Sequence, residues 1–175
     1  MKNFLRLSAM LIALGMVVAG CGSSKSTASG TTACDTKGSV ATGTSATYRY
    51  VVDLGPMEQM FDRASAAGKP AGSGEVMLGG SMTDANGPNA EHLEVHICTV
   101  SNSQVVVGAT PTINLTDTTA GTPAMSIDVA EMQGVGASQD DYHYGNNVLA
   151  PVGHSFVVAV SLNGEQVSLP FSRTS

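Results

Sequence analysis

The sequence predicts an all-β fold, an antiparallel β-sandwich with one short helix, for residues 47–175. Apolar and polar residues alternate along several short segments, as they do in half-buried strands. Turn-forming residues separate these segments, and helical spacing is confined to a single stretch. A chain segment of this length can bury a sizeable core as one domain.

The expected strands follow one another along the chain. Residues 47–54, TYRYVVDL, alternate apolar side chains from Tyr48 to Leu54. Further strands are expected at 74–82, 91–100, 104–108, 112–117, 124–131, 155–162 and 165–171. Turns are expected at 121–123, 134–136, Asn146-Asn147 and Asn163-Gly164, of which the last is typical of a tight β-hairpin.

The one expected helix covers residues 56–67. Pro56 suits a first helical turn, and apolar residues recur at helical spacing from Met57 to Ala64. Gly68 and Pro70 should end the helix.

Residues 1–20 have the pattern of a lipoprotein signal peptide. Lys2 and Arg6 precede the apolar run LSAMLIALGMVVAG, which is short for a membrane span. The ending VAGC resembles the bacterial lipobox, which implies cleavage before Cys21 and lipid on that cysteine. The alternatives are a transmembrane anchor, or a plain export signal beside a coincidental cysteine.

A flexible tether is expected over residues 21–46, which are rich in Ser, Thr, Gly and Ala. Such a segment buries too little apolar surface to offset its ordering entropy. It would link lipidated Cys21 to the β-sandwich of residues 47–175, so that the domain is held at the extracytoplasmic face of the cell membrane.

The charge of the chain argues against nucleic acid as a partner. The full sequence has a net charge of −6, and without residues 1–20 it has 6 basic and 14 acidic residues, a net charge of −8. A nucleic-acid-binding domain would need a basic face. An acidic exported protein is compatible with the capture of cations, although charge alone does not establish it.

Two cysteines remain once Cys21 carries lipid. Export would place Cys34 and Cys98 where a disulfide can persist. Alternatively, Cys98 stays buried as a thiol or serves as a metal ligand. The sequence leaves these alternatives open.

Residues 92–98, HLEVHIC, place four polar or metal-capable side chains at every second position: His92, Glu94, His96 and Cys98. Alternation puts all four on one face of a strand. That face is either an ordinary solvated face or half of a metal site. Met132 is a further candidate, because it falls out of the apolar register of AMSIDVAEM and a thioether favours copper. A core-filling methionine is the alternative.

No catalytic constellation is apparent. The sequence has no G-x-S-x-G nucleophile motif, and Asp140-Asp141 is typical of solvated loop carboxylates. His154, alone at the start of a strand, is expected to be structural. We therefore expect a binding protein rather than an enzyme.

A family resemblance extends over about residues 90–165. EHLEVHI, followed about fifty residues later by YHYGNNV, resembles the periplasmic ferrous-iron-transport-associated proteins. Those proteins accompany bacterial iron permeases, have an immunoglobulin-like β-sandwich and bind copper. The resemblance implies the same fold here and matches His92, Glu94, Met132 and His143 to the family's ligand pattern. The gap from Met132 to His143 is longer than the family's usual gap.

One ligand of that family has no counterpart. The family takes a further histidine from a His-rich loop, where this chain has only the Asn163-Gly164 turn. His96 is the candidate replacement.

These observations favour a membrane-tethered, extracytoplasmic copper-binding lipoprotein, with iron as the cargo of a partner permease. The alternative is an immunoglobulin-like envelope lipoprotein that binds a protein or polymer without metal. A superoxide-dismuting copper enzyme ranks last, because the expected His-x-His set and bridging histidine are missing. The sequence leaves open whether a homodimer completes the site.

Overall fold

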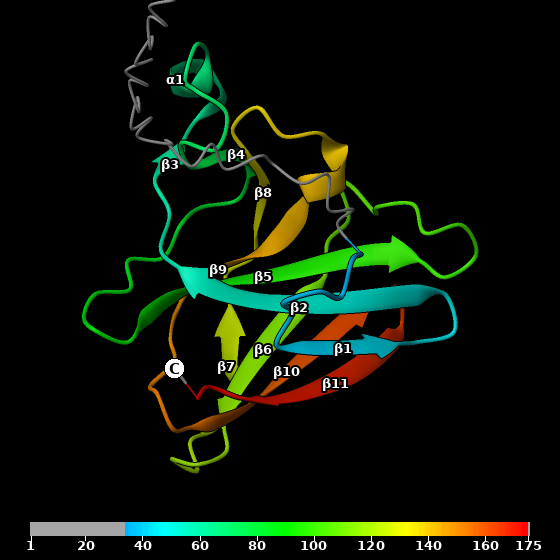
Figure 1. The fold of residues 1–175 in the computed structure, drawn as a ribbon. Helices are drawn as coiled ribbons and strands as arrows, with labels where there is room; N and C mark the ends of the chain where they lie inside the picture. The colour runs from blue at the N-terminus through cyan, green and yellow to red at the C-terminus, as the bar shows by residue number, and fades with distance from the viewer. Residues whose placement is uncertain (1–33, 175) are drawn as a thin grey trace, which may run out of the picture.

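The computed structural model describes residues 34–174, and it is an all-β sandwich of two sheets (Figure 1). This confirms the predicted all-β class with one short helix. The immunoglobulin-like connection pattern remains a prediction. The expected signal peptide, Cys21 and the first part of the tether lie outside the described residues.

The larger sheet has seven strands, in the order β1 (Ala41–Thr44), β2 (Tyr48–Pro56), β5 (Ala90–Thr99), β9 (His143–Leu149), β8 (Ala130–Gly134), β4 (Glu75–Gly79) and β3 (Met60–Phe61). The smaller sheet orders β11 (Glu165–Ser172), β10 (Ser155–Leu162), β6 (Thr112–Asp117) and β7 (Met125–Ile127). Neighbouring strands are antiparallel, except that β3 runs parallel to β4. The helix α1 covers Arg63–Ala66, and a 3₁₀ turn, η1, covers Gln139–Asp141.

The main core lies between the two sheets. Alternate residues of β2, β5 and β9 face those of β6 and β10, and the fully buried members include Val52, Leu93, Val95, Tyr144, Ile113, Val158 and Val160. Burying each large aliphatic side chain contributes about 1.5–3 kcal/mol. Because alternate residues occupy the two faces of a strand, the remaining side chains of β5 and β9 lie on the outer face of the larger sheet.

The expected helix over 56–67 is wrong in extent. β2 continues through Pro56, and residues 60–61 pair with β4, so only Arg63–Ala66 is helical. Asp62 begins this turn, because its carboxylate accepts a hydrogen bond of 2.7 Å from the amide of Ser65. Pairing with a sheet edge therefore outweighs the helical spacing of the methionines.

The expected turn at Asn146-Asn147 is also wrong, since both residues lie inside β9. The side chain of Asn146 accepts a hydrogen bond from the backbone amide of Asn147 at 2.8 Å, and both side chains also bond a neighbouring loop. The Asn146 amide accepts from the amide of Thr83 at 2.7 Å and donates to the carbonyl of Ser81 at 2.9 Å. Asparagine here fastens two segments together rather than reversing the chain.

Two other strand predictions need correction. Residues 124–131 do not form one strand, because the chain leaves β7 in the smaller sheet and enters β8 in the larger one. β8 then runs to Gly134, and the turn expected at 134–136 is present at residues 135–136. Residues 104–108 form only a single bridge, between Val105 and Cys98. The backbone beyond it is held by tyrosine hydroxyls, which accept from the amides of Gly108 and Ala109.

The ends of the domain agree only partly with the expectation. The Asn163-Gly164 hairpin turn is confirmed, with φ of 51° and 80°, the left-handed values of a two-residue hairpin turn. The sheet, however, begins at β1, within the segment that was assigned to the tether. This strand pairs with β2, and a Cβ at Gly43 would collide with Leu169 of β11, so the small residues of β1 also let it pack closely against β11.

Candidate metal centre

The outer face of the larger sheet carries all five predicted metal ligands. On β5, His92, Glu94 and His96 alternate with core residues. β9 lies beside β5, and β8 follows, with Met132 directly opposite His143. Directly opposed residues share a face, so Met132 joins the same surface.

This face is buried rather than solvated. His92 exposes 0% and His143 1% of their surface, and Met132 is fully buried. An ordinary solvated strand face, the first alternative for HLEVHIC, is therefore excluded at these positions.

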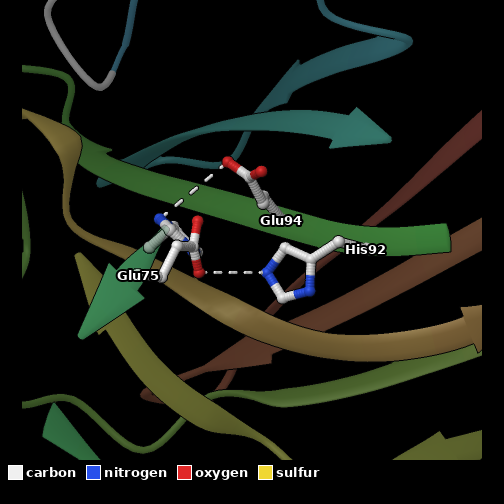
Figure 2. Close-up of side chains that lie close together, drawn as sticks. Glu75, His92 and Glu94 are labelled. Carbon is white, nitrogen blue, oxygen red and sulfur yellow. Dashed lines mark hydrogen bonds and ion pairs between the residues drawn. The ribbon is translucent and has the colours of Figure 1, made fainter. Parts of the chain in front are cut away.

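Four side chains converge here: Glu75, His92, Glu94 and His143, whose donor atoms all lie within 4.8 Å of one another. Figure 2 shows Glu75 of β4 approaching His92, with Glu94 on the same side of β5. Glu75 Oε2 lies 3.4 Å from His92 Nε2 and 3.2 Å from His143 Nε2. Metal–ligand bonds of about 2 Å would require only a small inward shift of these donors.

The far ring nitrogens of both histidines are held by oxygen atoms. His92 Nδ1 lies 2.9 Å from the side-chain oxygen of Asn147, and His143 Nδ1 lies 2.9 Å from the carbonyl of Asp141. Each Nδ1 can thus donate a proton, which leaves Nε2 as the free electron-pair donor. Metal-binding histidines are oriented in this way.

One buried atom of the cluster has no hydrogen bond. His92 Nε2 is inaccessible to solvent and makes none, although Glu75 lies nearby. Buried polar atoms normally have a partner. A metal ion between His92, His143 and the two glutamates would supply that partner, so these residues fit a metal.

Two glycines leave room on this face. Gly145 lies opposite Glu94, and a Cβ there would be 1.8 Å from the carbonyl oxygen of Leu93. Gly134 lies opposite Glu75 in the register of β4 and β8. A Cβ at Gly134 would collide with the carboxylate of Asp141. The glycine of the HYGNN segment therefore permits the close approach of β9 to β5.

The charges of the cluster stabilise one another. Burial alone would raise the pKa of the Glu75 carboxyl, but the hydrogen bond from His143 and the nearby charges of His143 and His92 outweigh it and lower the pKa to about 2. Burial alone would lower the pKa values of His92 and His143, but the Glu75 carboxylate raises both. Without a metal, protons on the histidines offset the negative charge of the glutamates.

Glu58 adds to this negative field. Partial desolvation raises the pKa of its carboxyl, and the charges of Glu75 and Glu94 raise it further. A cation at the cluster would relieve this repulsion.

His96 lies in a neighbouring group rather than in the four-residue cluster. Its Nε2 is 3.4 Å from Asp53 Oδ2 and 3.3 Å from Glu94 Oε2. Burial opposes protonation, but these two carboxylates raise the pKa of His96 to about 10. The expected replacement of the missing family ligand by His96 stays a prediction, and the four-residue cluster contains Glu75 rather than His96.

Cys98 and His154 make structural contacts away from the four-residue cluster. Cys34 and Cys98 form a disulfide with a Cα–Cα distance of 6.3 Å, which removes Cys98 from the candidate ligands. His154 pairs with Asp117 at 2.7 Å, on the smaller sheet side of the molecule.

Sequence reasoning missed Glu75 and Asp53. One available signal for Glu75 was that this charged residue begins the otherwise apolar strand GEVML. For Asp53 the signal was Val51, an apolar residue on the supposedly polar face of TYRYVVDL that proves fully buried. Neither signal identifies a ligand until the strand order is known.

Comparison with known proteins found no matching family model, curated protein or solved structure. The resemblance to the iron-transport-associated proteins therefore stays a prediction. Within residues 34–174, none of the helices has the length and apolar character needed to cross a membrane.

Proposed function

We propose that this protein is an extracytoplasmic copper-binding lipoprotein whose metal centre consists of Glu75, His92, Glu94 and His143. The observation that carries the proposal is the buried His92 Nε2, which has no hydrogen bond and lies among donors suited to a metal. Its role would be the capture and delivery of metal rather than catalytic turnover.

Copper is favoured over other metals by the donor types. Imidazole binds Cu, Zn, Fe and Ni, while a thioether selects copper, above all Cu(I). Met132 is buried directly opposite His143, so a thioether is available on the same face. Assistance to an iron permease is supported by the family resemblance alone.

Pulsed electron paramagnetic resonance of the untagged protein with one equivalent of Cu(II) tests this centre. We expect two coupled imidazole nitrogens, one of which disappears in His92→Ala and the other in His143→Ala. His154→Ala, which removes a histidine paired outside the cluster, should leave both signals. A protein that takes up no copper would instead favour an envelope module that binds its partner without metal.

Membrane attachment depends on VAGC and needs its own test. Mass spectrometry of the membrane-extracted protein should show lipid on Cys21, and Cys21→Ala should abolish membrane attachment or cleavage. An unmodified Cys21 in the processed wild-type protein would contradict the anchor.

A further inference from the structure

A second cluster lies beside the metal centre, on the same face of the larger sheet. Asp53, Glu94 and His96 bring one donor atom each within 4.8 Å of one another. Asp53 lies directly opposite Glu94 in the register of β2 and β5, and His96 follows two residues later. Glu94 belongs to both clusters.

Like His92 and His143, His96 has its Nδ1 atom held by an oxygen atom. Its Nδ1 lies 3.1 Å from the backbone carbonyl of Tyr142, an oxygen that can only accept. Nδ1 therefore carries hydrogen, and Nε2 faces Asp53 and Glu94. A bare nitrogen electron pair facing two carboxylates would be repelled, so a positive species must lie between them: a proton on Nε2, or a metal ion.

The position of Glu94 links the two clusters. Its Oε2 atom lies 3.3 Å from His96 Nε2, and one of its carboxylate oxygens lies within 4.8 Å of the donor atoms of Glu75, His92 and His143. The second cluster is also the more open one. The Asp53 side chain is 34% exposed, whereas Glu75, His92 and His143, which belong to the first cluster alone, expose at most 5% of theirs. An ion could reach the second cluster from solvent without passing through the first.

We propose that Asp53, Glu94 and His96 bind a second, divalent cation, and that Glu94 is shared between the two metal sites. Two carboxylates and one imidazole form a harder donor set than the first centre with its neighbouring thioether, and they suit Zn²⁺, Fe²⁺ or Mn²⁺. The inference extends the proposed function, but its own donors do not include Glu75, His92 or His143.

Zinc uptake by copper-loaded, untagged protein tests the proposal. The protein is given one equivalent of copper, dialysed against Zn²⁺, and analysed for both metals. We expect one zinc per chain beside the copper. Asp53→Asn and His96→Gln should retain copper and bind zinc at least tenfold more weakly.

The matched controls are Asp117→Asn and His154→Gln, which alter another histidine–carboxylate pair, located away from both clusters. These variants should bind zinc as the parent does. If the parent takes up no zinc, or if Asp53→Asn and His96→Gln bind zinc as well as the parent, Asp53 and His96 form only a salt bridge and the proposal is overturned. Loss of copper binding with zinc binding retained would contradict the proposed copper centre and leave the second site standing.

Discussion

Gly145 allows β9 to lie close to β5 on the face that carries the candidate metal ligands. Gly145→Ala would place a methyl group 1.8 Å from the carbonyl oxygen of Leu93 and push β9 away from β5. We expect the free energy of unfolding to fall by at least about 1–3 kcal/mol, as for other overpacked sites. Copper affinity should fall as well, since Glu94 and His143 would separate.

Chemical denaturation and calorimetry of Gly145→Ala measure both effects. Gly55→Ala is the matched control, because Gly55 lies opposite His92 on the same face and a Cβ there would meet no atom within 4 Å. Equal stability of the two variants would contradict the close approach of the strands.

Met132→Leu tests whether the proposed copper centre uses a thioether ligand. Met132→Leu keeps most of the side-chain volume but removes the sulfur, so it should weaken Cu(I) binding more than Cu(II) binding. Competition titrations with a chelator for each oxidation state measure the difference. Met125→Leu, a change of an exposed methionine in the smaller sheet, should alter neither affinity. Equal losses for Cu(I) and Cu(II) would show that the sulfur does not bind the metal.

At the scale of strands, alternation of apolar residues predicted part of each sheet, because it depends only on which face of a strand is buried. It located the strands around β2, β5, β6, β10 and β11 and the hairpin at Asn163-Gly164. It missed β9, because Asn146 and Asn147 normally favour turns and here their side chains bond a separate loop.

The candidate site was predictable only in part, because a local pattern shows which residues share a strand face but not which strands are neighbours. The shared face of His92, Glu94 and His96 follows from one strand alone. Glu75 is 68 residues from His143, and the two meet only because β4, β8 and β9 are neighbours in the sheet. The order of strands depends on long-range packing, which a local pattern does not encode.

The disulfide ties the segment before β1 to β5. It joins residues 64 apart in the chain, and closing a loop of that size contributes about 4 kcal/mol in the chain-entropy model. We expect Cys34→Ala/Cys98→Ala to lose up to this amount in guanidinium unfolding, with the single variant Cys34→Ala losing as much. Unchanged stability in both variants would mean that the bond does not constrain the unfolded chain.

For the whole molecule, the histidine cluster makes stability depend on pH. His92, His96 and His143 all have pKa values above the ordinary value of 6.5, and that of His96 reaches about 10. Protonated histidines with raised pKa values stabilise the fold fully below pH 6.5, and this contribution is lost as pH rises through the folded pKa values. The metal-free protein should therefore become less stable between pH 6.5 and 10.

Copper should reverse this trend, because it binds the deprotonated imidazoles and replaces the lost positive charge. Guanidinium unfolding of metal-free and copper-loaded protein at pH 6, 8 and 10 measures both curves. A metal-free protein whose stability stays constant or rises over this range would show that the histidines are not held by the carboxylates.

The central claim is that Glu75, His92, Glu94 and His143 form one copper centre, and Glu75 tests it most directly because only the fold brings it to the histidines. Glu75→Gln keeps the shape of the side chain and removes its charge. In calorimetric copper titration of untagged protein, we expect one tight site in the parent, at least tenfold weaker binding in Glu75→Gln, and unchanged binding in His154→Gln. Copper binding by Glu75→Gln that equals that of the parent would contradict the claim.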